Sequence, residues 1–314
     1  MTPKILCVVG PTASGKTKMG VALAKAYNGE VVSVDSMQIY RGMTIGTAAP
    51  TPDEMEGIPH HMIAVADPGE SWSVARFCEM ADGCIQDILG RGKLPILVGG
   101  TGLYLDALVR GTDFASGSAG GETRTMLQNR MAQEGSAVLL EELRTIDPTA
   151  AEKLHLKDEK RIIRALEVYL ETGMTITEHN RRTRQTPPKY DAVYIGLDFA
   201  HRQDLRDRID RRVDLMVQQG LLQEVRTLLS SGLPRSATAL QAIGYKQFLA
   251  VEEGLITEQE AVEEVKLRSR QYAKRQLTWL RRNKDIHWLY WEKEPIFSLA
   301  LQKATEILTA EGLR

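Results

Sequence analysis

The first residues of the chain place a glycine-rich loop between a short apolar run and a helical pattern. Residues 5–9 are apolar, residues 18–27 have helical composition, and the loop between them reads Gly10-Pro11-Thr12-Ala13-Ser14-Gly15-Lys16-Thr17. Backbone N–H groups of such a loop converge on phosphate oxygens, and the following helix points its positive end at them. The sequence therefore predicts a strand–loop–helix site for a diphosphate or a triphosphate.

Each residue type in the loop has a physical role. Gly10 and Gly15 let the backbone curl closely, Lys16 neutralises charge between phosphates, and the Thr17 hydroxyl suits a Mg²⁺ ion. A chance match without bound phosphate is the alternative, and the flanking strand and helix disfavour it. The loop alone does not identify the reaction, because kinases, NTPases and some transferases all use it.

Composition bounds the class of protein. The chain has 314 residues, of which 43% are apolar and 26% charged, so it is long enough for two globular units. Its net charge of −1 excludes a uniformly basic nucleic-acid binder. Cys7, Cys78 and Cys84 show no CxxC spacing and indicate reduced thiols. The apolar run at residues 5–9 is too short for a signal peptide or membrane span, so we expect a soluble, cytoplasmic protein.

Alternating strand and helix patterns predict an α/β fold. The candidate strands are residues 5–9, 30–34, 94–98, 193–197 and 286–289, with helical patterns between them. This order is typical of a P-loop NTPase-like, doubly wound parallel sheet with flanking helices and its site at the carboxyl ends of the strands.

A long gap between the third and fourth strands predicts an inserted all-helical domain. Its helical patterns are residues 124–134, 137–145 and 159–171. We expect a core of residues 1–111 and 190–314, with a basic C-terminal helical region, and an insertion at 112–189. Residues 114–121 are Gly/Ser-rich and expected to be mobile, and Thr186-Pro187-Pro188 marks the end of the insertion.

Two strand ends carry further candidates. Asp35 follows the second strand and would lie beside the phosphate loop if those strands are neighbours. It is suited to holding Mg²⁺ through water, acting as a general base, or capping the next turn, and capping or metal support is the commoner use. Thr101 follows the third strand in Gly99-Gly100-Thr101-Gly102, where many kinases have an acidic residue. Its hydroxyl either faces the site or simply caps a helix.

A basic run near the C-terminus points to nucleic acid. Between Lys266 and Lys284 there is no acidic residue, and the run contains Arg268, Arg270, Tyr272, Lys274, Arg275, Trp279, Arg281 and Arg282. On a helix, this pattern offers cations for phosphates and aromatic surfaces for unstacked bases. A solvated helix face is the ordinary alternative.

Together these motifs resemble the tRNA dimethylallyltransferase (tRNA isopentenyltransferase) family. The matching segments are GPTASGKT at 10–17, VDSMQIYRGMTIGTAAP at 34–50, GIPHHMI at 57–63, LVGGTGLYLDAL at 97–108, KRIIRALEVYLETG at 160–173, RIDRRVDLMVQQGLLQEV at 208–225, QAIGYKQ at 241–247 and KRQLTWLR at 274–281. They occur in order over nearly the full length. The chain departs from the family at 114–121, where a proline-rich segment is usual.

The resemblance implies a reaction. Members transfer a dimethylallyl group from dimethylallyl diphosphate to the exocyclic amine of the adenine 3′-adjacent to the anticodon, in tRNAs that read codons beginning with U, and release diphosphate. Asp35 then resembles the base, and Thr101 the hydroxyl near the reacting centre. The diphosphate would be bound by Gly10, Thr12, Ala13, Ser14, Gly15, Lys16, Thr17 and Arg212, with Mg²⁺ at Thr17.

The resemblance also implies a tRNA surface that contacts the anticodon stem-loop. Its residues would be Asp35, Ser36, Met37, Gln38, Lys160, Arg161, Arg164, Gln241, Gly244, Lys246, Lys274, Arg275, Trp279 and Arg281. We expect a monomer with no membrane association. The adjacent His60 and His61 lack further ligands at metal spacing, so packing or hydrogen bonding is the expected role.

Three other functions remain open at this point. A small-molecule or nucleotide kinase would need a nucleobase pocket. A non-catalytic GTPase-like or ATPase-like RNA-binding switch would call for an NKxD motif, which the sequence lacks. A transferase that prenylates free AMP or ADP would have no use for the long basic helix.

Overall fold

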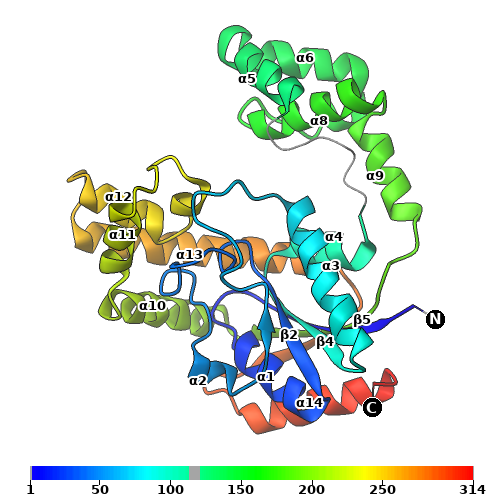
Figure 1. The fold of residues 1–314 in the computed structure, drawn as a ribbon, viewed down its shortest axis with the longest axis vertical. Coiled ribbons are helices and arrows are strands. Elements are labelled where there is room, and N and C mark those ends of the chain that lie inside the picture. Colours follow the sequence, from blue (N-terminus) through cyan, green and yellow to red (C-terminus); the bar gives the residue numbers. More distant parts are fainter. Residues whose placement is uncertain (1, 113–120, 314) are drawn as a thin grey trace. The chain divides into compact units, whose positions relative to one another are not determined.

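The computed structural model describes residues 2–112 and 121–313 and is built on a six-stranded sheet (Figure 1). In spatial order the strands are β3 (His60–His61), β2 (Gly29–Val34), β4 (Leu94–Gly99), β1 (Lys4–Val9), β5 (Asp191–Phe199) and β6 (Ile286–Trp291). All neighbouring strands pair in parallel, which confirms the predicted α/β class. The loops after the strands therefore open at one edge of the sheet.

Helices cover both faces of this sheet (Figure 1). The helices of this part of the chain are α1 (Lys16–Ala26), α2 (Pro52–Met55), α3 (Val74–Gly90), α4 (Gly102–Arg110), α10 (Arg202–Gln218), α11 (Leu221–Ser230), α12 (Tyr245–Glu252), α13 (Glu258–Leu280) and α14 (Phe297–Ala310), with a 3-10 turn η1 (Thr238–Gln241). Alternation along β1 sends Cys7 to the face covered by α3 and α4, and Val8 to the face covered by α1 and α14.

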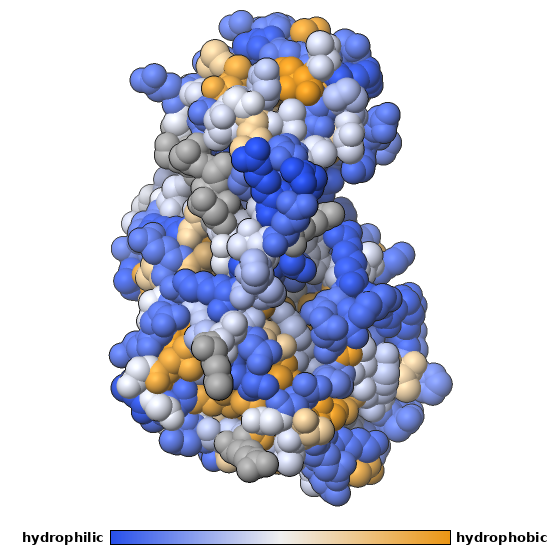
Figure 2. Space-filling view, turned by 90° about the vertical axis from the view of Figure 1, so that its right-hand side faces the viewer, coloured by the Kyte–Doolittle hydropathy of each residue, from blue (hydrophilic) through white to orange (hydrophobic). Residues whose placement is uncertain are grey.

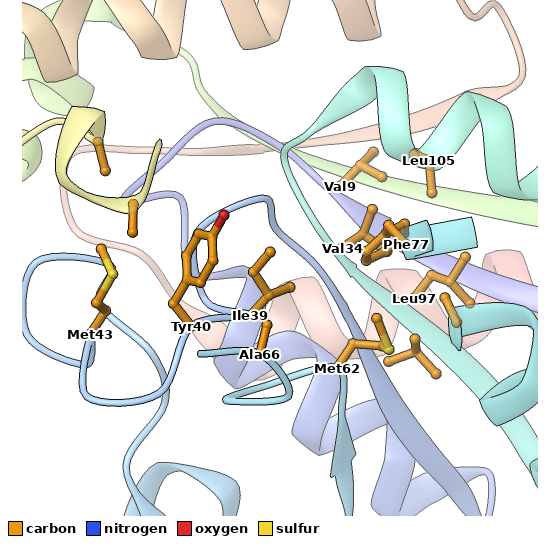
Figure 3. Close-up of a cluster of buried hydrophobic side chains, with 14 of the residues drawn as sticks. Val9, Val34, Ile39, Tyr40, Met43, Met62, Ala66, Phe77, Leu97 and Leu105 are labelled. Atoms are coloured by element: carbon orange, nitrogen blue, oxygen red, sulfur yellow. The ribbon is translucent and has the colours of Figure 1, made fainter. Parts of the chain in front are cut away.

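One hydrophobic core fixes the carboxyl ends of three strands. Phe77 of α3 and Leu105 of α4 gather with Val9, Val34 and Leu97 (Figure 3). None of these side chains is more than 4% exposed. Because burying each large apolar side chain contributes about 1.5–3 kcal/mol, the loops that follow β1, β2 and β4 start from rigid positions.

The contact pattern separates residues Arg110–Lys189 from the rest of the chain as a compact unit. Its helices are α5 (Glu122–Glu134), α6 (Ser136–Ile146), α7 (Pro148–Ala151), α8 (Glu159–Thr172) and α9 (Ile176–Gln185). Leu127, Leu139 and Leu166 form part of its own buried core. The sequence predicts α5, α6 and α8 but misses α7 and α9. Of the Gly/Ser-rich segment, residues 114–120 lie outside the described residues.

The strand order decides a condition that the sequence leaves open. β2 and β1 are not neighbours, because β4 lies between them. Helical crossovers allow a strand to be skipped, so adjacency along the chain does not give adjacency in the sheet. Asp35 still lies at the same edge as the phosphate loop, since all strands are parallel.

Hydrophilic residues predominate on the face that is drawn in Figure 2. Apolar residues form patches among them, several in the lower half of the view. Within residues 2–112 and 121–313, no helix is long and apolar enough to cross a membrane.

A buried carboxylate in β2, Glu30, ties this strand to β3 and to the turn that precedes β4. Glu30 is 2% exposed and accepts hydrogen bonds from Arg91, from Lys93 Nζ at 2.8 Å and from His61 Nε2 at 2.8 Å. His60 bonds Ile58 O instead, so both histidines have the expected hydrogen-bonding role. The described residues contain no cluster of His, Cys, Asp and Glu side chains suited to a metal.

The hydrogen bonds from Arg91 hold the pKa of Glu30 well below its usual range. Burial raises this pKa, whereas the hydrogen bonds from Lys93 and His61 lower it.

This depressed pKa predicts an acid-dependent contribution to stability. A carboxylate with a lowered native pKa stabilises the fold above its unfolded pKa and loses that contribution as the pH falls. Glu30→Gln should lower the free energy of unfolding by about 2 kcal/mol at pH 7, the scale of hydrogen bonds to a charged group. Urea denaturation should show the difference from wild type shrinking below about pH 5. Glu56→Gln, at an exposed carboxylate, is the control, and equal effects of the two substitutions would contradict the prediction.

Candidate active site

The phosphate loop has the strained geometry that its glycines permit. A Cβ at Gly10 would lie 2.3 Å from Leu197 O and 2.8 Å from Ser14 Oγ, so no larger residue fits. Ala13 and Gly15 have φ values of 63° and 87°, in the left-handed region. Alternation of such residues turns successive N–H groups toward a common centre. No side chain caps the start of α1, which leaves its first N–H groups to an anion.

Gln276 of α13 joins this loop to the turn after β4. Its Oε1 accepts a hydrogen bond from Thr12 N at 2.9 Å, and its Nε2 donates to Gly100 O at 3.1 Å. The side chain is only 6% exposed. Trp291 of β6 holds the loop from another side by donating to Ser14 O at 2.8 Å. Sequence reasoning missed both contacts. Gln276 lies within the basic run, where a solvent-facing or RNA-facing side chain is expected.

Three cations surround the loop. Lys16 Nζ donates to Pro11 O at 2.6 Å, Arg212 reaches Thr12 Oγ1 at 3.4 Å and Ala48 O at 3.3 Å, and Arg208 Nε donates to Ala13 O at 3.2 Å. Arg208 is absent from the sequence prediction, although its place four residues before Arg212 puts both on one face of α10.

Burial makes these charges costly. The pKa of Lys16 is lowered to about 7, mainly by burial. The charge of Arg212 contributes to this lowering, and the charge of Asp35 opposes it. Burial also lowers the pKa values of Arg212 and Arg208. Such clustered cations are relieved by a bound anion.

Asp35 serves two neighbours at once. Its Oδ1 accepts hydrogen bonds from Met37 N at 2.8 Å and Gln38 N at 3.2 Å, so one oxygen caps the turn. The structure gives Oδ2 no hydrogen bond to the described residues. The charge of Asp35 also acts on Lys16 and Arg212. Oδ1 therefore caps the turn, as one of the alternatives expects, and Oδ2 is available for another role.

Two hydroxyl oxygens at the site are buried and poorly satisfied. Thr101 Oγ1 and Ser14 Oγ form no hydrogen bond of normal geometry with the described residues, although the Tyr272 hydroxyl approaches Thr101. Thr101 is thus not a plain side-chain cap of α4. Tyr272 lies close to it, and burial, aided by the charge of Asp35, raises the pKa of Tyr272 to about 12, so its hydroxyl stays protonated. An unsatisfied buried hydroxyl costs about 1–3 kcal/mol, which a polar ligand would recover.

A single carboxylate fixes the loop that follows Asp35. Glu224 of α11 accepts from Ile45 N at 2.8 Å, Gly46 N at 3.0 Å and Tyr245 Oη at 2.5 Å. Gln38 holds the same loop, since its Oε1 accepts from Ser33 Oγ at 2.8 Å and its Nε2 donates to Ala48 O at 3.2 Å. Both ends of the Gln38 amide are therefore engaged, whereas Ser36 and Met37 beside it are partly exposed.

The predicted tRNA residues on α13 fall on different faces. Trp279 Nε1 donates to Asp106 Oδ2 at 2.7 Å and its ring lies against Gly102, which leaves less of the ring for a base than the sequence suggests. Lys274 and Arg275 are exposed. Arg281 pairs with Asp198 at 3.1 Å, so acidic residues from other elements balance part of the basic run.

The remaining predicted tRNA residues lie on other elements. Gln241 and Lys246 are exposed, and Gly244 is buried at the start of α12. Within the helical unit, Lys160 and Arg161 are exposed, but Arg164 pairs with Glu167, which is fully buried and also bound by Arg124. Arg164 therefore contributes to the interior of its own unit.

The lowered pKa of Lys16 predicts pH-linked anion binding. A bound diphosphate favours the ammonium form, so below about pH 7 the charge is already present, and above pH 7 binding must take up a proton. Above pH 7, the affinity of the wild-type protein for diphosphate should therefore fall by up to tenfold per pH unit, measured relative to Lys16→Met. Isothermal titration with inorganic diphosphate at pH 8, in two buffers of different ionisation enthalpy, should show proton uptake by wild type beyond that of the variant. Equal proton uptake by both proteins would contradict this role.

The bridge made by Gln276 predicts a positioning effect. Gln276→Met keeps the volume but leaves Thr12 N and Gly100 O without partners. Diphosphate affinity should fall by about tenfold, the scale of one lost buried hydrogen bond. Thr278→Ala, on the exposed side of α13, is the matched control. Diphosphate binding by Gln276→Met at wild-type strength would show that the loop holds its shape without this bridge.

Comparison with known proteins gives the family. The family model "IPP transferase" matches residues 38–283, and "Isopentenyl transferase" matches residues 3–64. The tRNA dimethylallyltransferase of Halalkalibacterium halodurans is 47% identical over 288 residues, 92% of this chain and 91% of the relative. That of Acetivibrio thermocellus is 45% identical over 285 residues, 91% of each chain.

Solved structures agree. The full-length tRNA isopentenylpyrophosphate transferase of Bacillus halodurans is 42% identical with a TM-score of 0.73, covering 98% of this chain and 96% of its own. A eukaryotic dimethylallyltransferase, crystallised while acting on tRNA, is 29% identical with a TM-score of 0.83, covering 98% and 80%. On the family-model match and the near full-length identity, this chain belongs to the tRNA dimethylallyltransferase family.

Proposed function

We propose that this protein transfers the dimethylallyl group of dimethylallyl diphosphate to the exocyclic amine of the adenine 3′-adjacent to the anticodon, in tRNAs that read codons beginning with U. The observation that carries the proposal is a phosphate loop ringed by three half-buried cations, with Asp35 and the Thr101 hydroxyl at the same sheet edge. The family relationship supports this chemistry over phosphoryl transfer.

The loop binds the diphosphate as a leaving group. As the allylic carbon–oxygen bond breaks, negative charge grows on the diphosphate, and Lys16 and Arg212 stabilise it together with the loop N–H groups. Preorganised cations in a buried site are suited to this, because they need little reorganisation when the charge develops. Arg208 adds a third positive charge beside Ala13.

A divalent ion fits the same place. The described residues offer no protein cage for a metal, but Mg²⁺ is commonly held by one or two protein oxygens plus phosphates and water. Thr17, in the first turn of α1, would hold it, and the ion would add positive charge to the diphosphate oxygens.

The acceptor amine forms a bond to the allylic carbon and becomes acidic as it does so. Asp35 Oδ2 then takes one proton from the nitrogen, while Oδ1 keeps the carboxylate oriented through Met37 N and Gln38 N. Thr101 provides a hydroxyl hydrogen bond near the reacting centre.

The proposed contacts to tRNA are made by side chains outside the diphosphate site: Ser36, Met37, Gln241, Lys246, Lys160, Arg161, Lys274, Arg275 and Arg281. We also propose that the protein is cytoplasmic, where tRNA is available, and that it acts as a monomer.

The direct test uses bulk tRNA from cells that lack this modification. Protein, Mg²⁺ and dimethylallyl diphosphate should yield prenyl-adenosine by nucleoside mass spectrometry. With AMP or ADP as the only acceptor, we expect no product. Prenylated mononucleotide without prenylated tRNA would replace the proposal with the free-nucleotide transferase.

Asp35→Asn separates proton transfer from binding. Asparagine can still cap the turn through its oxygen, but it cannot accept the proton. Single-turnover transfer should slow by ~10²–10⁴, the usual effect of a positioned general base, with tRNA and diphosphate affinities little changed. Thr101→Ala should slow transfer less, because it removes one neutral hydrogen bond. Normal transfer by Asp35→Asn, or recovery on raising Mg²⁺, would assign Asp35 to the turn or to metal support.

A further inference from the structure

Two opposite faces of helix α13 carry polar side chains. Tyr272 and Gln276 face the phosphate site. Arg270, Lys274 and Arg281 turn to the opposite side, because residues about four apart share a helix face. There they line, with α10 and the end of β5, a pocket of about 520 Å³. None of the residues assigned above to diphosphate binding or proton transfer lines this pocket.

The floor of the pocket is apolar. It is formed by Phe199, Leu205 and Leu277, which are 4%, 6% and 6% exposed. At the rim, Leu267 and Tyr290 are large apolar or aromatic side chains that stay 40% and 54% exposed. A flat ring system inserted here would bury these surfaces and stack on Tyr290.

The rim is positively charged. The lining includes five cationic side chains and two carboxylates, a balance of +3. Asp210 and Asp198 pair with Arg270 at 2.6 Å and Arg281 at 3.1 Å. The other three cations, which form no ion pair with described residues, are Arg202, Arg206 and Lys274. The first turn of α10 also lines the pocket and has no side-chain cap, which adds positive potential.

We propose that this pocket binds an unpaired nucleotide of the tRNA substrate, other than the adenosine that is prenylated. The base lies on the apolar floor beside Tyr290, and Arg206 and Lys274 contact the adjoining phosphates. An apolar floor with an exposed ring under unpaired cations matches a nucleotide better than an acidic peptide, which offers no flat surface to stack. The inference rests on the proposed function, because the ligand is part of that substrate.

The test compares charge and stacking variants with a matched control. Arg206→Glu and Tyr290→Ala change the pocket, whereas Lys303→Glu makes the same charge change at an exposed position of α14. With an unmodified tRNA transcript, KM for tRNA should rise about tenfold in Tyr290→Ala, the scale of one lost stacking contact. Arg206→Glu should flatten the salt dependence of tRNA affinity by roughly one unit of slope. The kcat and the KM for dimethylallyl diphosphate should stay at wild-type values, as should all constants of Lys303→Glu.

The nucleotide is identified by photo-crosslinking. Benzoylphenylalanine in place of Leu267 should crosslink one unpaired tRNA position distinct from the prenylated adenosine. Wild-type KM and salt slope in both pocket variants would overturn the inference, as would a crosslink to the reacting adenosine or an altered KM for dimethylallyl diphosphate. If the wild-type protein fails to prenylate tRNA, the proposed function fails instead. Salt-dependent tRNA binding by fluorescence anisotropy then decides the pocket by itself, because loss in Arg206→Glu but not in Lys303→Glu supports it and equal binding overturns it.

Discussion

Gln276 holds together the two loops that form the proposed active site. Its side-chain oxygen accepts a hydrogen bond from Thr12 N of the phosphate loop, and its side-chain nitrogen donates to Gly100 O, next to Thr101. A glutamine that is only 6% exposed is acceptable because both ends of its amide are satisfied. The spacing between the phosphate loop and the turn that carries Thr101 therefore depends on a residue from the far end of the chain.

The free protein carries an unbalanced charge pattern that substrate is suited to complete. Lys16, Arg208 and Arg212 are brought together with lowered pKa values, and Thr101 and Ser14 have hydroxyl oxygens without a hydrogen bond of normal geometry to the described residues. Clustered positive charges of this kind cost stability unless an anion is bound. In the proposed reaction, negative charge develops at this place, and such an arrangement favours a transition state over a bound ground state.

Periodicity predicted much of the fold, because strands and long helices are local. The strands other than β3 appear near their expected positions, whereas β3 has two residues and no pattern to detect. The glycine-rich loop could be predicted because the spacing of its residues determines its local backbone geometry. The roles of three other residues could not be predicted, since Gln276, Trp291 and Arg208 each contact a residue more than 190 positions away in the sequence. The pairing of Arg164 with Glu167 was missed for another reason: its positions are only three apart, but the sequence does not tell which helix face is buried.

The central claim is that the phosphate loop releases an intact diphosphate by carbon–oxygen cleavage and does not transfer a phosphoryl group. Dimethylallyl diphosphate labelled with ¹⁸O at the oxygen that joins its C1 carbon to phosphorus tests this in a single turnover with tRNA. Cleavage of the carbon–oxygen bond should leave all of the label in the released diphosphate. Label recovered in dimethylallyl alcohol or in dimethylallyl monophosphate would mean attack at phosphorus and would contradict the claim.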